Sequence, residues 1–221
     1  MKVLICIAVL ATAAVGLCQL YPTPLGITGA AAFRLTEIRV QQEFRISASQ
    51  AQAIQEIIEQ HGALQTALSK RLETAKSNDF ESIQKQIENA EVGTSRKIVD
   101  VLNPDQRKRL REVSLQEIGP FAMRNAEIAK ELGLTPAQRN QVEALAKKTV
   151  LELDEINAKM ASELEAIPDG KAGDAKRTKV VMSYDAKLKT AETQKEKALL
   201  ALLSKPQQAT WQKLLGRPFK L

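Results

Sequence analysis

The chain is poor in the side chains from which metal sites, redox centres and covalent cross-links are built. Its 221 residues include one histidine, His61, and two cysteines, Cys6 and Cys18, and aromatic residues make up only 4%. A zinc site or a Cys–His catalytic pair needs several such side chains, and a disulfide scaffold needs more cysteines. We therefore expect no metal, no cofactor and no disulfide framework, and we expect the ring of His61 to pack on a helix face between Ile57 and Leu64.

The sequence also lacks the short motifs that mark common catalytic sites. It has no Ser/His/Asp set, no glycine-rich phosphate loop and no HExxH motif. Its glutamates are spread over segments predicted to be helical, without the pattern of an acid–base pair in a cleft. We therefore expect a protein that is not an enzyme.

The first residues resemble an export signal. Lys2 is followed by an apolar run from Val3 to Leu17 that ends in small residues, as in a secretory signal peptide. Cleavage after Gly16 or after Cys18 would satisfy the preference for small residues, and we take residues 1–18 as the signal peptide and 19–35 as a flexible leader. The alternative is an uncleaved anchor. Either way the sequence predicts a periplasmic, envelope or secreted protein.

The spacing of apolar residues predicts an all-α fold. Long stretches without proline cover residues 25–103, 137–167 and 169–205, and within them apolar residues recur every three or four positions, as on one face of a helix. We expect long helices over residues 47–75, 77–102 and 142–167, and from about 174 to 203. In the third, the eleven-residue repeat from Val142 to Ile167 indicates a nearly straight or slightly right-handed pairing.

One short motif occurs four times. An Ile or Leu is followed by Ser, Thr or Asn and, three residues later, by Gln. The polar residue suits the N-cap of a helix, and the glutamine can reach back to the cap's own N–H to close a capping box. We call these segments boxes 1 to 4: Ile46-Ser47-Ala48-Ser49-Gln50, Leu102-Asn103-Pro104-Asp105-Gln106, Leu134-Thr135-Pro136-Ala137-Gln138 and Leu203-Ser204-Lys205-Pro206-Gln207.

The order of the boxes predicts a duplication. Residues 36–121 and 122–221 each contain a box, a long helical hairpin, a second box, a short helix and a stop rich in Gly, Pro and Phe. The stops are Gly119-Pro120-Phe121 and Gly216-Arg217-Pro218-Phe219. Because the hairpin turns are short, we expect antiparallel helices in two tandem related modules.

The repeated box, in a cysteine-poor helical chain that begins like an exported protein, resembles the LTXXQ-motif family of Spy/CpxP-like periplasmic stress proteins and chaperones. Box 3 matches the motif most closely, box 4 keeps Leu, a hydroxyl cap and Gln, and Asn103 replaces the threonine in box 2. The resemblance implies an ATP-independent chaperone or stress-response protein built from long helices. It also implies cradle-shaped dimers, although four boxes would let one chain supply what two subunits supply in that family.

Positive charge is concentrated at the end of the sequence. The chain has a net charge of +6, of which residues 171–221 contribute +8 and residues 1–170 contribute −2. Such a basic segment attracts acidic chains or anionic membrane surfaces, although it can equally be a solvated helix face. Nucleic acid is not expected because stacking aromatic residues are scarce. The candidate client-binding residues are Lys176, Lys179, Lys187, Lys189 and Lys197.

Three functions follow from these observations. The first is a chaperone that holds unfolded or envelope proteins. The second is a structural or sensor protein of the envelope that binds one specific partner or a second copy of itself. The third is a peripheral protein held by anionic membranes.

Overall fold

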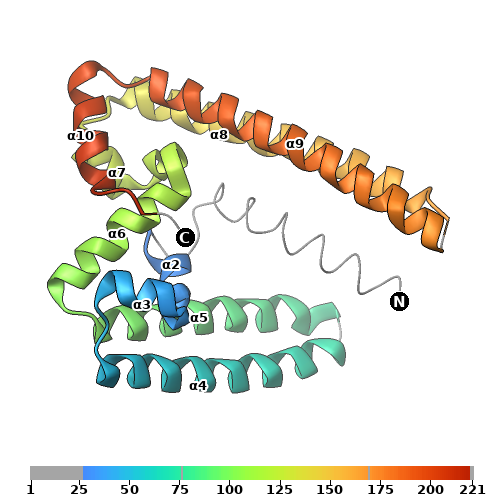
Figure 1. Ribbon diagram of the computed structural model, residues 1–221, viewed down its shortest axis with the longest axis horizontal. Helices are drawn as coiled ribbons and strands as arrows, with labels where there is room; N and C mark the ends of the chain where they lie inside the picture. The colour runs from blue at the N-terminus through green and yellow to red at the C-terminus, as the bar shows by residue number, and fades with distance from the viewer. Residues whose placement is uncertain (1–26, 76, 169, 220–221) are drawn as a thin grey trace. The chain divides into compact units, whose positions relative to one another are not determined.

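The computed structural model describes residues 27–75, 77–168 and 170–219, and all regular structure within them is helical (Figure 1). These ranges contain nine α-helices and two 3₁₀ helices. The all-α prediction is confirmed. The predicted signal peptide, residues 1–18, lies outside the described residues. None of the helices that the structure describes combines the length and the apolar character needed to cross a membrane.

The contacts between residues divide the chain into two units, which we name by their hairpins. The α4–α5 unit contains described residues 27–118 together with 212–219, and the α8–α9 unit contains residues 119–211. The chain passes from one unit to the other after α6 and again within α10. The boundary predicted between residues 121 and 122 lies three residues inside the α8–α9 unit, within the 3₁₀ helix η2 (Gly119–Arg124).

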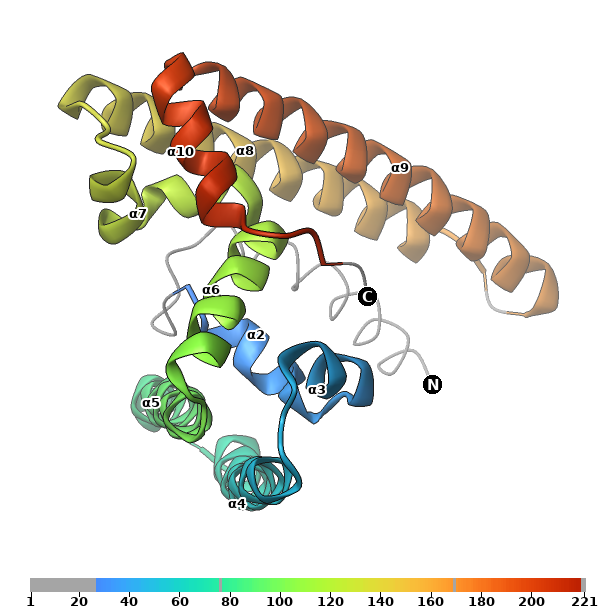
Figure 2. The ribbon, with the colours of Figure 1, turned by 60° about the vertical axis from the view of Figure 1, so that its left-hand side comes forward.

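The α4–α5 unit is built on an antiparallel hairpin of two long helices (Figure 1). Four shorter elements pack against this hairpin or against one another, and Figure 2 shows α4 and α5 almost end-on. The elements of the unit are α2 (Gly29–Phe33), η1 (Arg34–Thr36), α3 (Ile38–Phe44), α4 (Ala48–Glu73), α5 (Ser77–Val101) and α6 (Pro104–Ile118).

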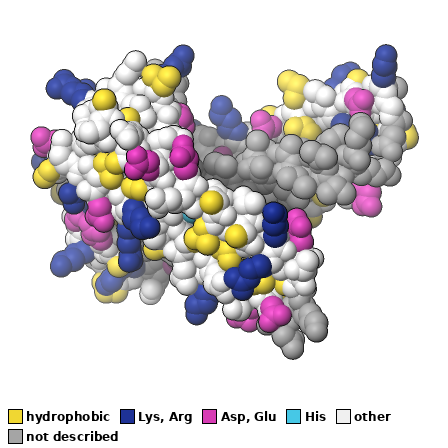
Figure 3. Space-filling model, turned by 90° about the horizontal axis from the view of Figure 1, so that it is seen from below, with side chains coloured by type: hydrophobic (Ala, Val, Ile, Leu, Met, Phe, Trp, Pro, Cys, Tyr) yellow, Lys and Arg dark blue, Asp and Glu magenta, His cyan; other side chains and the backbone are white. Residues whose placement is uncertain are grey.

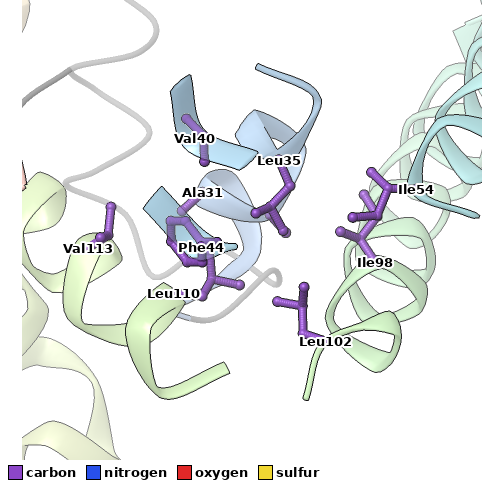
Figure 4. Packing of buried hydrophobic residues seen from close by; sticks show 10 residues of the cluster. Ala31, Leu35, Val40, Phe44, Ile54, Ile98, Leu102, Leu110 and Val113 are labelled. Carbon is purple, nitrogen blue, oxygen red and sulfur yellow. The ribbon is translucent and has the colours of Figure 1, made fainter. Parts of the chain in front are cut away.

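The core of this unit corrects one expectation from the sequence. Residues 19–35 were expected to form a flexible leader, but their described end is helical and buried: Ala32 and Leu35 are fully enclosed. Figure 4 shows Leu35 facing Ile54 and Ile98 of the hairpin. The small residues of the segment Gly29–Phe33 allow α2 to pack closely, so a stretch without a long apolar pattern still contributes to the core.

The α8–α9 unit is built on a second antiparallel hairpin. Its elements are η2, α7 (Ala126–Glu131), α8 (Pro136–Glu165), α9 (Lys171–Ala201) and most of α10 (Lys205–Leu215). Two polar contacts join the long helices: Tyr184 donates a 2.7 Å hydrogen bond to Glu163, and Lys195 lies 2.7 Å from Glu152.

The apolar stripe predicted for the third long helix faces the interior. Val142, Thr149, Leu153 and Met160 are buried, and the remaining positions of the stripe are half-buried. Thr149 satisfies its hydroxyl by donating to the carbonyl of Leu145 at 2.8 Å, so a polar residue in the stripe leaves no unpaired donor.

His61 packs as expected from the sequence. Its side chain is buried between α4 and α5, its Nδ1 lies 3.0 Å from the hydroxyl of Thr94, and its ring centroid lies 5.4 Å from that of Phe33.

Candidate functional site: paired glutamine boxes and a lysine face

The four boxes stand at the starts of helices, and boxes 1 to 3 form both of the local bonds that the sequence predicts. In boxes 1 and 3 the cap hydroxyl accepts from the glutamine N–H at 3.2 Å, and the glutamine Oε1 accepts from the cap N–H at 3.0–3.1 Å. Asn103 and Gln106 form both bonds at 2.9 Å. In box 4 the N–H of Ser204 donates to Gln207 at 2.9 Å.

The boxes also meet in pairs, a relation that is not among the expectations from the sequence. In the α4–α5 unit, Gln50 and Gln106 exchange two amide hydrogen bonds of 2.8 and 3.1 Å. In the α8–α9 unit, Gln138 and Gln207 do the same at 2.9 and 3.1 Å. Each pair joins the start of a long hairpin helix to the start of the short helix that follows the hairpin.

The second hydrogen of each amide binds a backbone carbonyl near the end of a helix. Gln50 donates to Val101 at 2.9 Å and Gln138 donates to Leu202 at 2.8 Å, in each case just before the leading leucine of the partner box. The other two glutamines donate to carbonyls just before the leading residue of the first box in each unit: Gln106 to Phe44 and Arg45 at 3.2 Å, and Gln207 to Gly133 at 3.1 Å.

These bonds explain why the motif ends in glutamine. A capping box alone accepts Glu or Gln, because only a side-chain oxygen is needed. Here each side chain must also donate two hydrogen bonds, and an ionised glutamate has none to give. A glutamine that caps a helix uses only its side-chain oxygen, so its NH2 group still needs acceptors. This unused donor group is the signal that could have predicted the pairing.

The leading residues of the boxes anchor the helix starts to different degrees. Leu102, Leu134 and Leu203 are buried, whereas Ile46 is only half-buried. Box 1 is therefore held chiefly by its hydrogen bonds, and the other three combine hydrogen bonds with burial of a leucine.

The five candidate lysines share the solvent face of α9. Lys176, Lys179, Lys187, Lys189 and Lys197 are all exposed, and none of them forms an ion pair with a described residue. Only Lys187 has a specific contact, with its Nζ 4.0 Å from the ring centroid of Tyr184.

This lysine face contains no carboxylate. At about 100° per residue the five lysines span an arc of roughly 160° of the helix, and the acidic residues of α9 fall outside it. These are Asp174, Asp185, Glu192 and Glu196. On the face drawn in Figure 3, by contrast, basic and acidic side chains lie interspersed. The lysine face therefore concentrates positive potential along one side of a long helix.

Two carboxylates of α9 are partly buried on the neighbouring side. Burial raises the pKa of Glu192, with the charges of Glu196 and Asp185 adding to the effect, and burial alone raises the pKa of Glu196. Glu196 Oε1 lies only 3.0 Å from where a Cβ on Gly119 would stand. Glu196 thus faces η2, whereas Asp174, Asp185 and the five lysines are exposed to solvent.

The described residues bring together no group of three or more His, Cys, Asp or Glu side chains that could hold a metal ion. No protein-family model, no curated protein and no solved structure matches the chain.

Proposed function

We propose that the protein is an exported, ATP-independent chaperone of the Spy/CpxP-like type, which holds partly unfolded envelope proteins on the lysine face of α9. The observation that carries the proposal is this face: exposed lysines on a helix of 31 residues, with no carboxylate among them. Each exposed lysine contributes little binding energy by itself. Such a surface therefore suits an acidic, extended chain that makes many weak contacts, and not a ligand held by one tight contact.

We also propose that the chain consists of two tandem, related hairpin modules, as the order of the boxes predicts. The matching bonds support this relation. In both units a glutamine of the first box binds a glutamine of the second, and both glutamines bind carbonyls at equivalent positions before the leading residues. Such agreement in long-range bonds is difficult to explain from helix capping alone.

The lysine face is tested by reversing its charge. The triple variant Lys176→Glu, Lys179→Glu, Lys197→Glu should lose the ability to suppress light scattering by an aggregating acidic client. The triple variant Lys70→Glu, Lys85→Glu, Lys97→Glu is the matched control, because it changes the net charge equally at exposed positions of the α4–α5 unit. Raising the salt concentration should weaken suppression by the unaltered protein, since salt screens exposed charges. Absence of suppression at molar excess in low salt would disprove the proposal.

An alternative is a non-enzymatic envelope protein that binds one structural or sensory partner or associates with itself. It predicts a saturable complex of fixed stoichiometry, or a mass that rises with concentration, and no general effect on aggregation. Attraction of the lysine face to an anionic membrane would instead appear as co-sedimentation with anionic vesicles that salt abolishes. Export itself is tested by cell fractionation.

A further inference from the structure

The last described residues, Gly216–Phe219, lie in a groove of the α4–α5 unit. Phe219 lies against apolar side chains from three helices, and the space left among the described lining residues is too small for a water molecule. Figure 4 draws the apolar side chains that line the groove, with Phe44 and Leu110 close to one another. The apolar lining consists of Ala31, Val40, Phe44, Leu110 and Val113.

The backbone of this segment is held by side chains and not by a helix or a sheet. Gln116 receives a 2.8 Å hydrogen bond from the N–H of Phe219 and donates one of 2.8 Å to the carbonyl of Arg217. Arg109, whose side chain is 9% exposed, donates to the same carbonyl at 2.7 Å. One amide that binds an N–H and a carbonyl two residues apart recognises an extended backbone whatever its side chains are.

The rim of the groove selects a basic residue. Glu43 binds the guanidinium of Arg217 at 2.7 Å, and Glu112 lies against Gly216 so closely that a Cβ there would stand 2.3 Å from it. Arg109 is itself neutralised by Glu43 and Glu112, at 2.8 and 3.0 Å, and its guanidinium carbon stands 5.9 Å from the ring centroid of Phe219. An occupant is thus recognised by a basic residue, an aromatic residue two positions later, and the backbone between them.

The two Gly/Pro/Phe stops of the chain differ in how firmly they are enclosed. Pro120 and Phe121 are buried in the α8–α9 unit, whereas Arg217 and Pro218 are exposed and Phe219 is only half-buried. The bonds that hold Gly216–Phe219 can therefore be replaced by those of another segment with the same chemistry, without opening a helix.

We infer that this groove is a second client-binding site, for extended segments with a basic residue two positions before an aromatic one, and that Gly216–Phe219 occupies it until a client displaces it. The inference rests on the proposed function, since it assigns a class of client to the chaperone. It complements the lysine face, which suits acidic segments.

The test uses a fluorescent peptide with the sequence of residues 212–221 and full-length protein, with binding followed by anisotropy. In the unaltered protein the tethered segment competes at a high effective concentration, so the peptide should bind weakly. Phe219→Ala removes the aromatic anchor of the tethered segment, and the peptide should then bind about tenfold more tightly or better. A peptide with alanine in place of its phenylalanine should not bind.

Two further variants locate the site. Adding Gln116→Ala to Phe219→Ala should abolish the gain, because the backbone clamp is lost. Phe80→Ala, which removes a half-exposed aromatic ring from α5, is the matched control and should leave peptide binding as weak as in the unaltered protein. If circular dichroism shows that Phe219→Ala does not fold, Arg217→Ala takes its place. Arg217 is exposed and loses only its pair with Glu43, so a smaller gain is expected.

The inference is overturned if neither variant binds the peptide more tightly than the unaltered protein does, or if Gln116→Ala leaves the gain intact. It is also overturned if the unaltered protein is a dimer that Phe219→Ala converts to a monomer, because the groove would then exchange segments between two copies.

An aggregation assay separates this inference from the proposed function. The Phe219→Ala variant should suppress aggregation of the client less well when its groove is saturated with peptide. This result supports both the chaperone function and the groove. If the protein suppresses aggregation but no variant binds the peptide, the groove is not a client-binding site and the proposed chaperone function stands. Peptide binding without any suppression overturns the chaperone, and with it the assignment of clients to the groove.

Discussion

Arg45 and Gly133 take the same left-handed backbone conformation, with φ values of 51° and 62°. Each ends a short helix, and in each case the next residue leads a box and donates its N–H back to a carbonyl at 2.9 Å, Ile46 to Gln41 and Leu134 to Ala129. Glycine adopts this conformation freely, whereas an L-residue does so at a cost of about 1–2 kcal/mol.

The first prediction follows from this difference. Arg45→Gly should stabilise the α4–α5 unit by about 0.5–1 kcal/mol. The substitution relieves the strain of the left-handed conformation, and part of that gain is offset because glycine loses more backbone entropy on folding. Gly133→Ala should destabilise by about 1 kcal/mol, although nothing lies within 4 Å of the added methyl group. The control is Gly62→Ala within α4, where the site is equally open and alanine should stabilise. Thermal melts followed by circular dichroism measure all three, and a Gly133→Ala protein as stable as the original would contradict the prediction.

The second prediction concerns the glutamine pairs. Gln207→Glu removes the donors to Gly133 and Gln138 and should cost about 1–3 kcal/mol at neutral pH. A protonated carboxyl regains one donor, so the introduced glutamate should have a raised pKa, and part of the loss should return as the pH falls through that raised value toward about 4. Gln141→Glu, at an exposed position of α8, is the control and should have little effect. Equal melting temperatures for the two variants would show that the pair contributes nothing.

The third prediction compares the parts of a box. Leu134 is 7% exposed, so Leu134→Ala should cost about 2–5 kcal/mol, and Thr135→Ala, which removes a cap, about 1 kcal/mol. Because Ile46 is only half-buried, Ile46→Ala should cost clearly less than Leu134→Ala. Chemical denaturation gives the three free energies of unfolding. Small and equal values would mean that the boxes are not built into the core.

The fourth prediction is a dependence on pH. Burial raises the pKa of Glu196, so the folded state binds a proton more readily than the unfolded state does, and stability increases as the pH falls through the raised value. Glu196→Gln should therefore raise the melting temperature at pH 7. The difference should disappear below about pH 4, where the carboxyl is protonated in both states. Glu165→Gln, at an exposed position near the end of α8, should show no such trend. A gain that grew on acidification would contradict the sign of the effect.

The sequence predicted the features that arise between near neighbours. The capping bonds of Ser47, Asn103 and Thr135 join residues three apart, and the stripe from Val142 to Met160 follows from the helical repeat, so both could be recognised without knowledge of the fold. The helix at Gly29–Phe33 could not. Apart from Phe33 its residues are small, and the segment is too short to show an apolar period, so only the contact with α5 in the folded chain reveals which surface it packs against.

Of the two candidate binding surfaces, one could be predicted from the sequence and the other could not. The lysine face of α9 could be predicted because position along one helix places its members. The groove around Phe219 could not be predicted, because Gln116 lies 103 residues before the residue whose N–H it binds.

The sequence by itself determined where the four helices that follow the boxes begin and which face of a long helix is apolar, since a cap and its helix are separated by one turn and a stripe needs only the helical period. The tertiary structure decided that box 1 pairs with box 2 and box 3 with box 4, and that the segment after α10 lies in the groove of the α4–α5 unit. The physical reason is that a glutamine amide or an apolar pocket binds any suitable group that reaches it. Which group reaches it depends on how the whole chain folds back on itself.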